Sequence, residues 1–280
     1  MTLALGNAGG DFRVGEVLSR AWSVFTGNIV FFLAVPLVIN GIYFLFNFVL
    51  GKFFVGFRTG LGPPVMVGVV PWTVILVSLG TLVLFLCLHM VAQGVLLMGA
   101  FQRLRGEPLR VGAALQRSVA RLLPLVAVSL LIVLAMIAVI VASFVVLWIL
   151  GLVLGRLVVV LSFAMFIPIF ILAIMWSVVV PACLVEGLGP IGSMVRSADL
   201  TRGYRWRVTG IVLLLALMAL VALIIMAFLL WLGPVAALVF EVVWLVVWTG
   251  YLNCAIIMIY HDLRVAKEGV DTAQIASVFD

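Results

Sequence analysis

The sequence contains few charged residues. Only 9% of its 280 residues are Asp, Glu, Lys or Arg, whereas 67% are hydrophobic. A soluble domain is about a quarter charged and about half apolar, so one core could not bury this excess. The composition therefore excludes a water-soluble globular protein and a disordered chain. Several apolar runs longer than about 18 residues indicate membrane-spanning helices instead.

Cysteine and histidine are also scarce. Cys87, Cys183 and Cys254 lie in apolar runs without a CxxC spacing, and the two histidines are His89 and His261. This excludes a disulfide scaffold, and we expect no metal site and no cofactor. The sequence has no Gly-rich phosphate loop, HExxH or GxSxG motif. Because carboxylates are too few for a paired acid–base site, we expect no enzymatic activity.

The apolar runs predict six spans, at 28–51, 72–101, 124–150, 157–184, 208–232 and 234–260. Each exceeds the roughly 20 residues that a bilayer core requires, so tilting or kinking is expected. Pro36, Pro168 and Pro181 fall inside spans, where we expect them to kink the helices. The predicted fold is an all-α polytopic membrane protein, a single integral membrane domain over 1–280 with six transmembrane helices arranged as three hairpins.

The distribution of basic residues predicts the orientation of the spans. The net charge is +6, but the basic residues lie in short loops beside spans, which indicates topology rather than a nucleic-acid partner. If both termini are cytoplasmic, only Lys52, Arg58 and Arg156 lie outside. Thirteen lie inside: Arg13, Arg20, Arg103, Arg105, Arg110, Arg117, Arg121, Arg196, Arg202, Arg205, Arg207, Arg264 and Lys267. We therefore expect a multi-pass protein of the bacterial inner (plasma) membrane.

Each predicted hairpin is preceded by a short amphipathic segment, at 13–25, 107–122 and 190–202. We expect these segments to be cytoplasmic helices at the membrane surface. Their apolar stripes are Val14, Leu18, Trp22 and Phe25; Val111, Leu115, Val119 and Leu122; and Ile191, Met194, Val195 and Ala198.

The three short segments resemble one another. Aligning Val14-Gly15 with Val111-Gly112 and Ile191-Gly192 gives spacings of 97 and 80 residues. This alignment places Arg117 opposite Arg20 and puts Ser197 at the same position in the third segment. We interpret one short helix plus one hairpin as an internal repeat. The alternative is chance similarity between short amphipathic patterns.

Several motifs in the second half of the chain carry a family resemblance. Residues 181–210 read PACLVEGLGPIGSMVRSADLTRGYRWRVTG, and residues 260–271 read YHDLRVAKEGVD. With FQRLRGEPLRVGAALQR at 101–117, they resemble the glycerophosphoryl diester phosphodiesterase membrane-domain family and its stand-alone bacterial relatives. In that family the membrane part can be joined to a soluble catalytic domain, for which this chain has no length. The resemblance therefore implies a fold and a membrane role, not diesterase activity, and supplies no catalytic residues.

The basic residues are also candidates for binding. Fourteen of the sixteen are arginine, whose planar fork can hold a phosphate through two hydrogen bonds. We predict that some of them grip anionic lipid headgroups or an acidic partner. These are Arg103, Arg105, Arg117, Arg121, Arg202, Arg205 and Arg207. The alternative is that they determine topology alone.

Four polar residues inside spans form a second candidate set: Glu241, His89, Gln93 and Asn40. An ionisable group within a bilayer is costly, so Glu241 is a functional candidate with Arg156 as its counter-charge; the alternative is an interfacial carboxylate. We expect His89 and Gln93 to form hydrogen bonds across helices, and Asn40, Asn47 and Asn253 to join helices.

Two functions follow. The first is a non-enzymatic inner-membrane protein that binds or organises anionic lipid, or is a subunit of a membrane assembly, through an Arg-rich cytoplasmic face. Its partners would be membrane phospholipid and a protein partner or a second copy. The second is a transporter or channel for a small amphipathic or lipid-like solute, lined by Glu241, His89 and Asn40. An enzyme acting on lipid headgroups is a third and weaker hypothesis.

Overall fold

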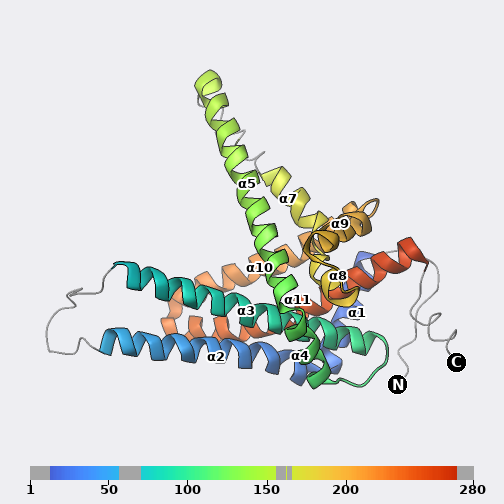
Figure 1. Ribbon diagram of the computed structural model, residues 1–280, viewed down its shortest axis with the longest axis horizontal. Helices are drawn as coiled ribbons and strands as arrows, with labels where there is room; N and C mark the ends of the chain where they lie inside the picture. Colours follow the sequence, from blue (N-terminus) through green and yellow to red (C-terminus); the bar gives the residue numbers. More distant parts are fainter. Residues whose placement is uncertain (1–12, 57–70, 156–161, 163–165, 270–280) are drawn as a thin grey trace.

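The computed structural model describes residues 13–56, 71–155, 162 and 166–269, a region of helices without strands (Figure 1). The long helices are α2 (Ile29–Gly56), α3 (Pro71–Leu104), α5 (Leu122–Leu154), α10 (Arg205–Leu232) and α11 (Pro234–Glu268). The shorter ones are α1 (Val14–Gly27), α4 (Val111–Ala120), α7 (Phe166–Met175), α8 (Val179–Val185) and α9 (Pro190–Thr201). Six segments, with α7 and α8 counted as one, are long and apolar enough to cross a membrane. The predicted all-α polytopic membrane fold is confirmed.

The short helices α1, α4 and α9 pack against the ends of spans. Helix α4 packs on α3 and α9 packs on α8, in each case the span that precedes it in the chain. Helix α1 packs on α11, the last span, so the arrangement closes into a cycle (Figure 1). We call the end of the molecule that carries α1, α4, α8 and α9 the basic end, and the opposite end, which carries the α10–α11 turn, the distal end.

The packed core lies at the basic end. Helix α11 contacts α1, α2, α3 and α10, and most of its buried residues follow Val246, in the half that leads to the basic end. Among its residues with described side chains, helix α5 buries only Leu125 and Val128, both in its first two turns, and it then leans away from α2, α3, α10 and α11 (Figure 1). Its 33 mostly apolar residues measure about 50 Å at 1.5 Å per residue. A bilayer core is about 30 Å thick, so such a helix must tilt strongly to stay within it.

Close contacts between spans depend on residues without bulky side chains. Pro36 has no N–H, so the carbonyl group of Phe32, one turn earlier in α2, lacks its intrahelical donor. Gly250 of α11 lies directly against that carbonyl: a Cβ atom on Gly250 would be 2.6 Å from the Phe32 oxygen. Lipid tails are as apolar as leucine, so burial of apolar side chains does not drive spans together within a bilayer. Close approach of the two backbones stabilises the contact instead.

The fourth span, predicted over 157–184 with kinks at Pro168 and Pro181, is broken at a different place. Within the described part it is interrupted at 176–178, between α7 and α8. Ser197 of α9 lies at the break, where its hydroxyl accepts from the Val178 N–H (3.3 Å) and donates to the Met175 carbonyl oxygen (2.7 Å). Pro181 is therefore not a kink within a helix. It is the third residue of α8, where no intrahelical N–H bond is required.

The short helices bury small residues and expose large apolar ones. Helix α4 buries Ala114 and Ser118, and α9 buries Ser193, Ser197 and Thr201, with Leu200 as the one large apolar exception. Most of their predicted apolar stripes are exposed: Val111, Leu115 and Val119 on α4, and Ile191 and Val195 on α9. Such outward apolar faces fit helices that lie on a membrane surface. Helix α1 is different, because Phe25 of its predicted stripe lies in the core while Trp22 is exposed.

Candidate functional site

Charged side chains from α9, α11 and the end of α8 form a paired cluster at the basic end, which we call the Glu186 network. The Glu186 carboxylate accepts from the Tyr260 hydroxyl (2.6 Å) and from Nε of Arg196 (2.9 Å). A second nitrogen of Arg196 donates to Glu268, and Nε of Arg264 donates to the same carboxylate (3.1 Å). Burial lowers the pKa of Arg196, but the hydrogen bonds to Glu268 and Glu186 outweigh this and raise it. Every member is paired, so the network ties three elements together.

Two further contacts join elements at the same end. Arg20 of α1 forms an ion pair with Asp262 of α11, whose side chain is 9% exposed. Arg121 donates to the Gly187 carbonyl oxygen (2.7 Å) in the turn between α8 and α9, where the positive φ of 71° favours glycine. A Cβ on Gly187 would lie 2.7 Å from the Arg121 guanidinium. Arg121, predicted to bind an anion, therefore already has a partner within the protein.

The other predicted arginines have a different environment. Arg105 stacks on the Phe101 ring (4.5 Å from guanidinium carbon to ring centroid) and lies 3.8 Å from the Glu107 carboxylate. Arg207 stacks on the Tyr204 ring at 5.6 Å. Five arginines at the basic end have no carboxylate within 4 Å among the described residues: Arg103, Arg110, Arg117, Arg202 and Arg205. We call them the unpaired arginines.

Part of this set borders a hollow between the last turn of α3 and α4. The hollow has a volume of about 460 Å³, and its polar lining consists of Gln102, Arg105, Glu107, Gln116 and Arg117. Gln102 is fixed in place, because its side-chain oxygen accepts from the Arg110 backbone N–H (3.0 Å). Two cations and one carboxylate leave the lining with net positive charge. The arrangement can hold an anionic group, and it brings Arg105 and Arg117 of the predicted set together.

The unpaired arginines Arg202 and Arg205 lie elsewhere, where α9 ends and α10 begins. Trp206 beside them is 88% exposed. An exposed tryptophan flanked by arginines is typical of a membrane interface. The predicted arginine set is therefore divided between the α3–α4 region and the α9–α10 junction rather than gathered in one site.

The polar residues within the spans bond to their own helices. Asn40 donates to the Pro36 carbonyl oxygen (2.7 Å), and Gln93 and His89 lie 3.3 Å apart on α3. Asn47 and Asn253 likewise donate to the carbonyl one turn earlier. The prediction that these groups bond across helices is therefore wrong, because the hydrogen bonds described for them stay within one helix.

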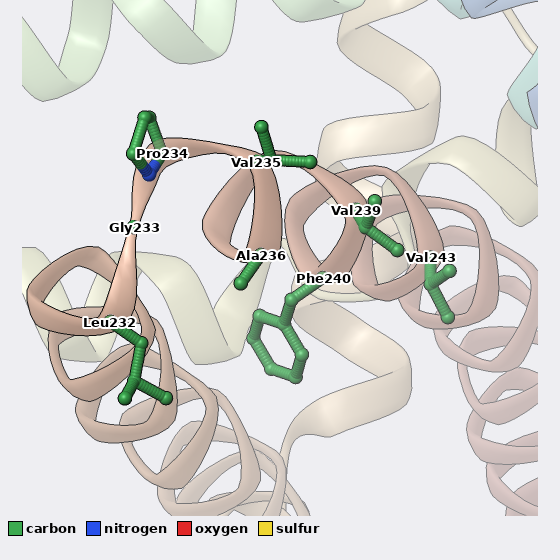
Figure 2. A pocket seen from close by; sticks show the side chains of 8 residues that line it. All are labelled: Leu232, Gly233, Pro234, Val235, Ala236, Val239, Phe240 and Val243. Carbon is green, nitrogen blue, oxygen red and sulfur yellow. The ribbon is translucent and has the colours of Figure 1, made fainter.

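Glu241 is exposed on α11 and has no hydrogen-bond or ionic partner among the described residues. Arg156, its predicted counter-charge, lies outside the described part. Near it, at the α10–α11 turn, is a hollow of about 880 Å³ lined by Leu232, Gly233, Pro234, Val235, Ala236, Val239, Phe240 and Val243 (Figure 2). Glu241 is not part of this lining. The hollow offers no polar side chain to a solute, so Glu241, His89 and Asn40 do not form one site there.

Sequence reasoning missed the Glu186 network. Its residues lie in EGLGP, MVRSADL and YHDLRVAKEG, motifs that carried the family resemblance without a physical explanation. The i, i+4 spacing of Tyr260, Arg264 and Glu268 was a usable signal for pairing along one helix face. The contacts with Glu186 and Arg196 join residues far apart in the chain and have no such signal.

The described residues contain no group of His, Cys, Asp and Glu side chains that could hold a metal ion. The chain matches no protein-family model, and no curated protein or solved structure is significantly similar to it. The resemblance to the glycerophosphoryl diester phosphodiesterase membrane-domain family therefore stays a prediction.

Proposed function

We propose that this protein is a non-enzymatic protein of the bacterial inner membrane that binds anionic phospholipid through its basic end, with both termini in the cytoplasm. The observation that carries the proposal is the presence of five arginines without a carboxylate partner among the described residues. An arginine next to a bilayer gains about 1 kcal/mol from anionic lipid, whereas an already neutralised arginine gains little. The unpaired arginines are thus the part of the surface that can still bind an anion.

The apolar surface beside these arginines supports the same proposal. Leu115 and Val119 of α4 and Val195 of α9 are about half exposed, and they lie on helices that carry or adjoin unpaired arginines. A helix with an exposed apolar face and cationic residues is the usual form of an interfacial membrane helix. Acyl chains can cover the apolar face while phosphates meet the guanidinium groups.

A transport function has less support. It would require polar groups gathered around a path, yet Glu241 is exposed and Asn40 and His89 have partners in their own helices. The hollow at the distal end is lined by apolar side chains. Lipid binding requires none of these groups.

Native mass spectrometry of the protein extracted in mild detergent tests the proposal. The variant carries Gln in place of Arg103, Arg110, Arg117, Arg202 and Arg205; the control carries Gln in place of Arg58 and Arg156, predicted at the opposite membrane surface. We expect the five-residue variant to retain at least tenfold less phosphatidylglycerol while the control is unchanged. Unchanged retention in a folded variant would contradict lipid binding. Loss of a stoichiometric protein partner instead of lipid would make the basic end an assembly surface.

A further inference from the structure

The buried positions of the three short helices reveal a shared pattern that differs from the alignment drawn from sequence. Each helix has Val, Ala or Ser, then Leu or Met, any residue, Arg, and Ala or Ser: VLSRA at 17–21, ALQRS at 114–118 and SMVRS at 193–197. The first and last residues of each five are almost fully buried, and each of the three helices packs on a span. The spacings are 97 and 79 residues, not 97 and 80. Arg196, rather than Ser197, therefore corresponds to Arg20 and Arg117.

The ends of the spans also correspond. FQRLR at 101–105 of α3 and YHDLR at 260–264 of α11 share their pattern, and each places an arginine over an aromatic ring one turn earlier. The ring-to-guanidinium distances are 4.5 Å for Arg105 on Phe101 and 5.9 Å for Arg264 on Tyr260. In this register Arg103 of α3 takes the position of Asp262 of α11. Similarly, Glu107 before α4 takes the position of Glu186 before α9, because both precede the shared arginine by ten residues.

The shared arginine has an internal carboxylate in two of the three units. Arg20 pairs with Asp262, and Arg196 pairs with Glu186 at 2.9 Å. The first kind of partner is an acid on the span, at the position of Asp262. In the middle unit that position holds an arginine, Arg103, so this partner is missing.

The second kind of partner is an acid ten residues before the shared arginine. In the middle unit this acid is Glu107, but it does not pair with Arg117. Glu107 lies 3.8 Å from Arg105 instead, and its side chain is 52% exposed, against 18% for Glu186. Arg117 is left without a carboxylate within 4 Å among the described residues, and it borders the hollow of about 460 Å³.

We propose that this hollow is a specific binding site for the phosphate of an anionic phospholipid. The phosphate pairs with Arg117 in the way that a carboxylate of the protein pairs with Arg20 and with Arg196. The guanidinium fork of Arg117 matches two phosphate oxygens, and the side-chain amides of Gln102 and Gln116 in the lining can donate to others. Leu115 and Val119 of the same helix are outside the lining, but they are exposed and suit acyl chains, which favours a lipid over free phosphate. The site rests on the proposed function and narrows it to one phosphate at one arginine.

Binding of short-chain phosphatidylglycerol, added as monomers to the detergent-purified full chain, tests the site. The variant is Arg117→Gln, and the matched control is Arg202→Gln, which removes an unpaired arginine away from the hollow. Both side chains are exposed, so neither change should impair folding, which a melting curve verifies. We expect Arg117→Gln to lower affinity at least tenfold and Arg202→Gln to lower it less than threefold.

The remaining outcomes separate the two proposals. Equal losses in both variants would overturn the site and leave the lipid-binding surface standing. If neither variant lost affinity, the site would be overturned. If the five-residue variant also retained as much lipid as the unmodified protein, the proposed function would be overturned as well. Displacement of the lipid by inorganic phosphate at equal concentration would overturn the lipid as ligand, because a lipid site gains affinity from the acyl chains that phosphate lacks.

Discussion

The α8–α9 and α3–α4 regions place similar residues in similar positions, but their charged side chains are paired differently. Around α9, Arg196 is held by Glu186 and Glu268, and the side chains are mostly shielded from solvent. Around α4, Arg117 borders a hollow while Glu107 lies with Arg105, both about half exposed. Shielded pairs hold helices together, whereas an exposed arginine without a partner contributes little to stability and is available to a ligand. The difference separates the charges that are paired within the fold from those that have no carboxylate partner among the described residues.

The largest effect should come from breaking the Glu186 network. Glu186→Gln removes the charge that Arg196 and Tyr260 share, so we expect a loss of about 2–3 kcal/mol in the free energy of unfolding. The matched control is Glu107→Gln, where an exposed pair should be worth less than about 0.5 kcal/mol. SDS-induced unfolding of both variants measures the difference. Equal losses would show that the two regions do not differ as proposed.

A smaller effect is expected from the serine that follows the shared arginine. Ser197 joins the two sides of the break between α7 and α8, so Ser197→Ala should cost about 1–2 kcal/mol by leaving the Val178 N–H without a partner. Ser118, at the matching position, donates only to the Ala114 carbonyl oxygen within α4 (2.7 Å). Ser118→Ala should therefore change stability by less than about 0.5 kcal/mol. The same unfolding assay compares them, and a larger loss for Ser118→Ala would contradict the role of Ser197.

The smallest effect is expected from supplying the missing acid, and this change is also the most direct test of the comparison. Arg103→Asp places a carboxylate where α11 has Asp262, so it should pair with Arg117 and raise stability by up to about 0.5 kcal/mol, a modest gain because the site is partly exposed. Retention of phosphatidylglycerol should fall at least threefold further than in Arg103→Asn, which removes the same cation without adding an acid. Equal retention in the two variants would show that the introduced carboxylate does not compete with lipid for Arg117.

The spans were predictable because long apolar runs have few alternatives to crossing a bilayer. The break at 176–178 was not, because it depends on Ser197 from a helix that follows the span. Aligning the three short segments by their buried residues shifts the third by one residue from the alignment by Val-Gly and Ile-Gly pairs, which are not buried. The small residues that contact the spans, such as Ser193 and Ser197, carry the register and are inconspicuous in a hydropathy pattern.

The candidate arginines were recognisable from residue type and position, but their separation into paired and unpaired was not. Arg196 and Arg117 both stand in a short amphipathic segment with a serine after them. The nearby charges differ, with Asp199 after Arg196 and Arg121 after Arg117, but neither of these residues is the partner that distinguishes the two arginines. The contacts that distinguish them reach residues 10 and 72 positions away, on other helices.

By itself the sequence determined that the chain forms membrane-spanning helices, roughly where they begin and end, and which short segments are amphipathic. These properties follow from composition and local periodicity. Only the tertiary structure decided which arginines have carboxylate partners, where α7 gives way to α8, and that the core lies at the basic end. The physical reason is that an apolar residue is stabilised by lipid at any position in a span. The interactions of a charged residue depend instead on the groups that the fold brings within a few ångströms of it.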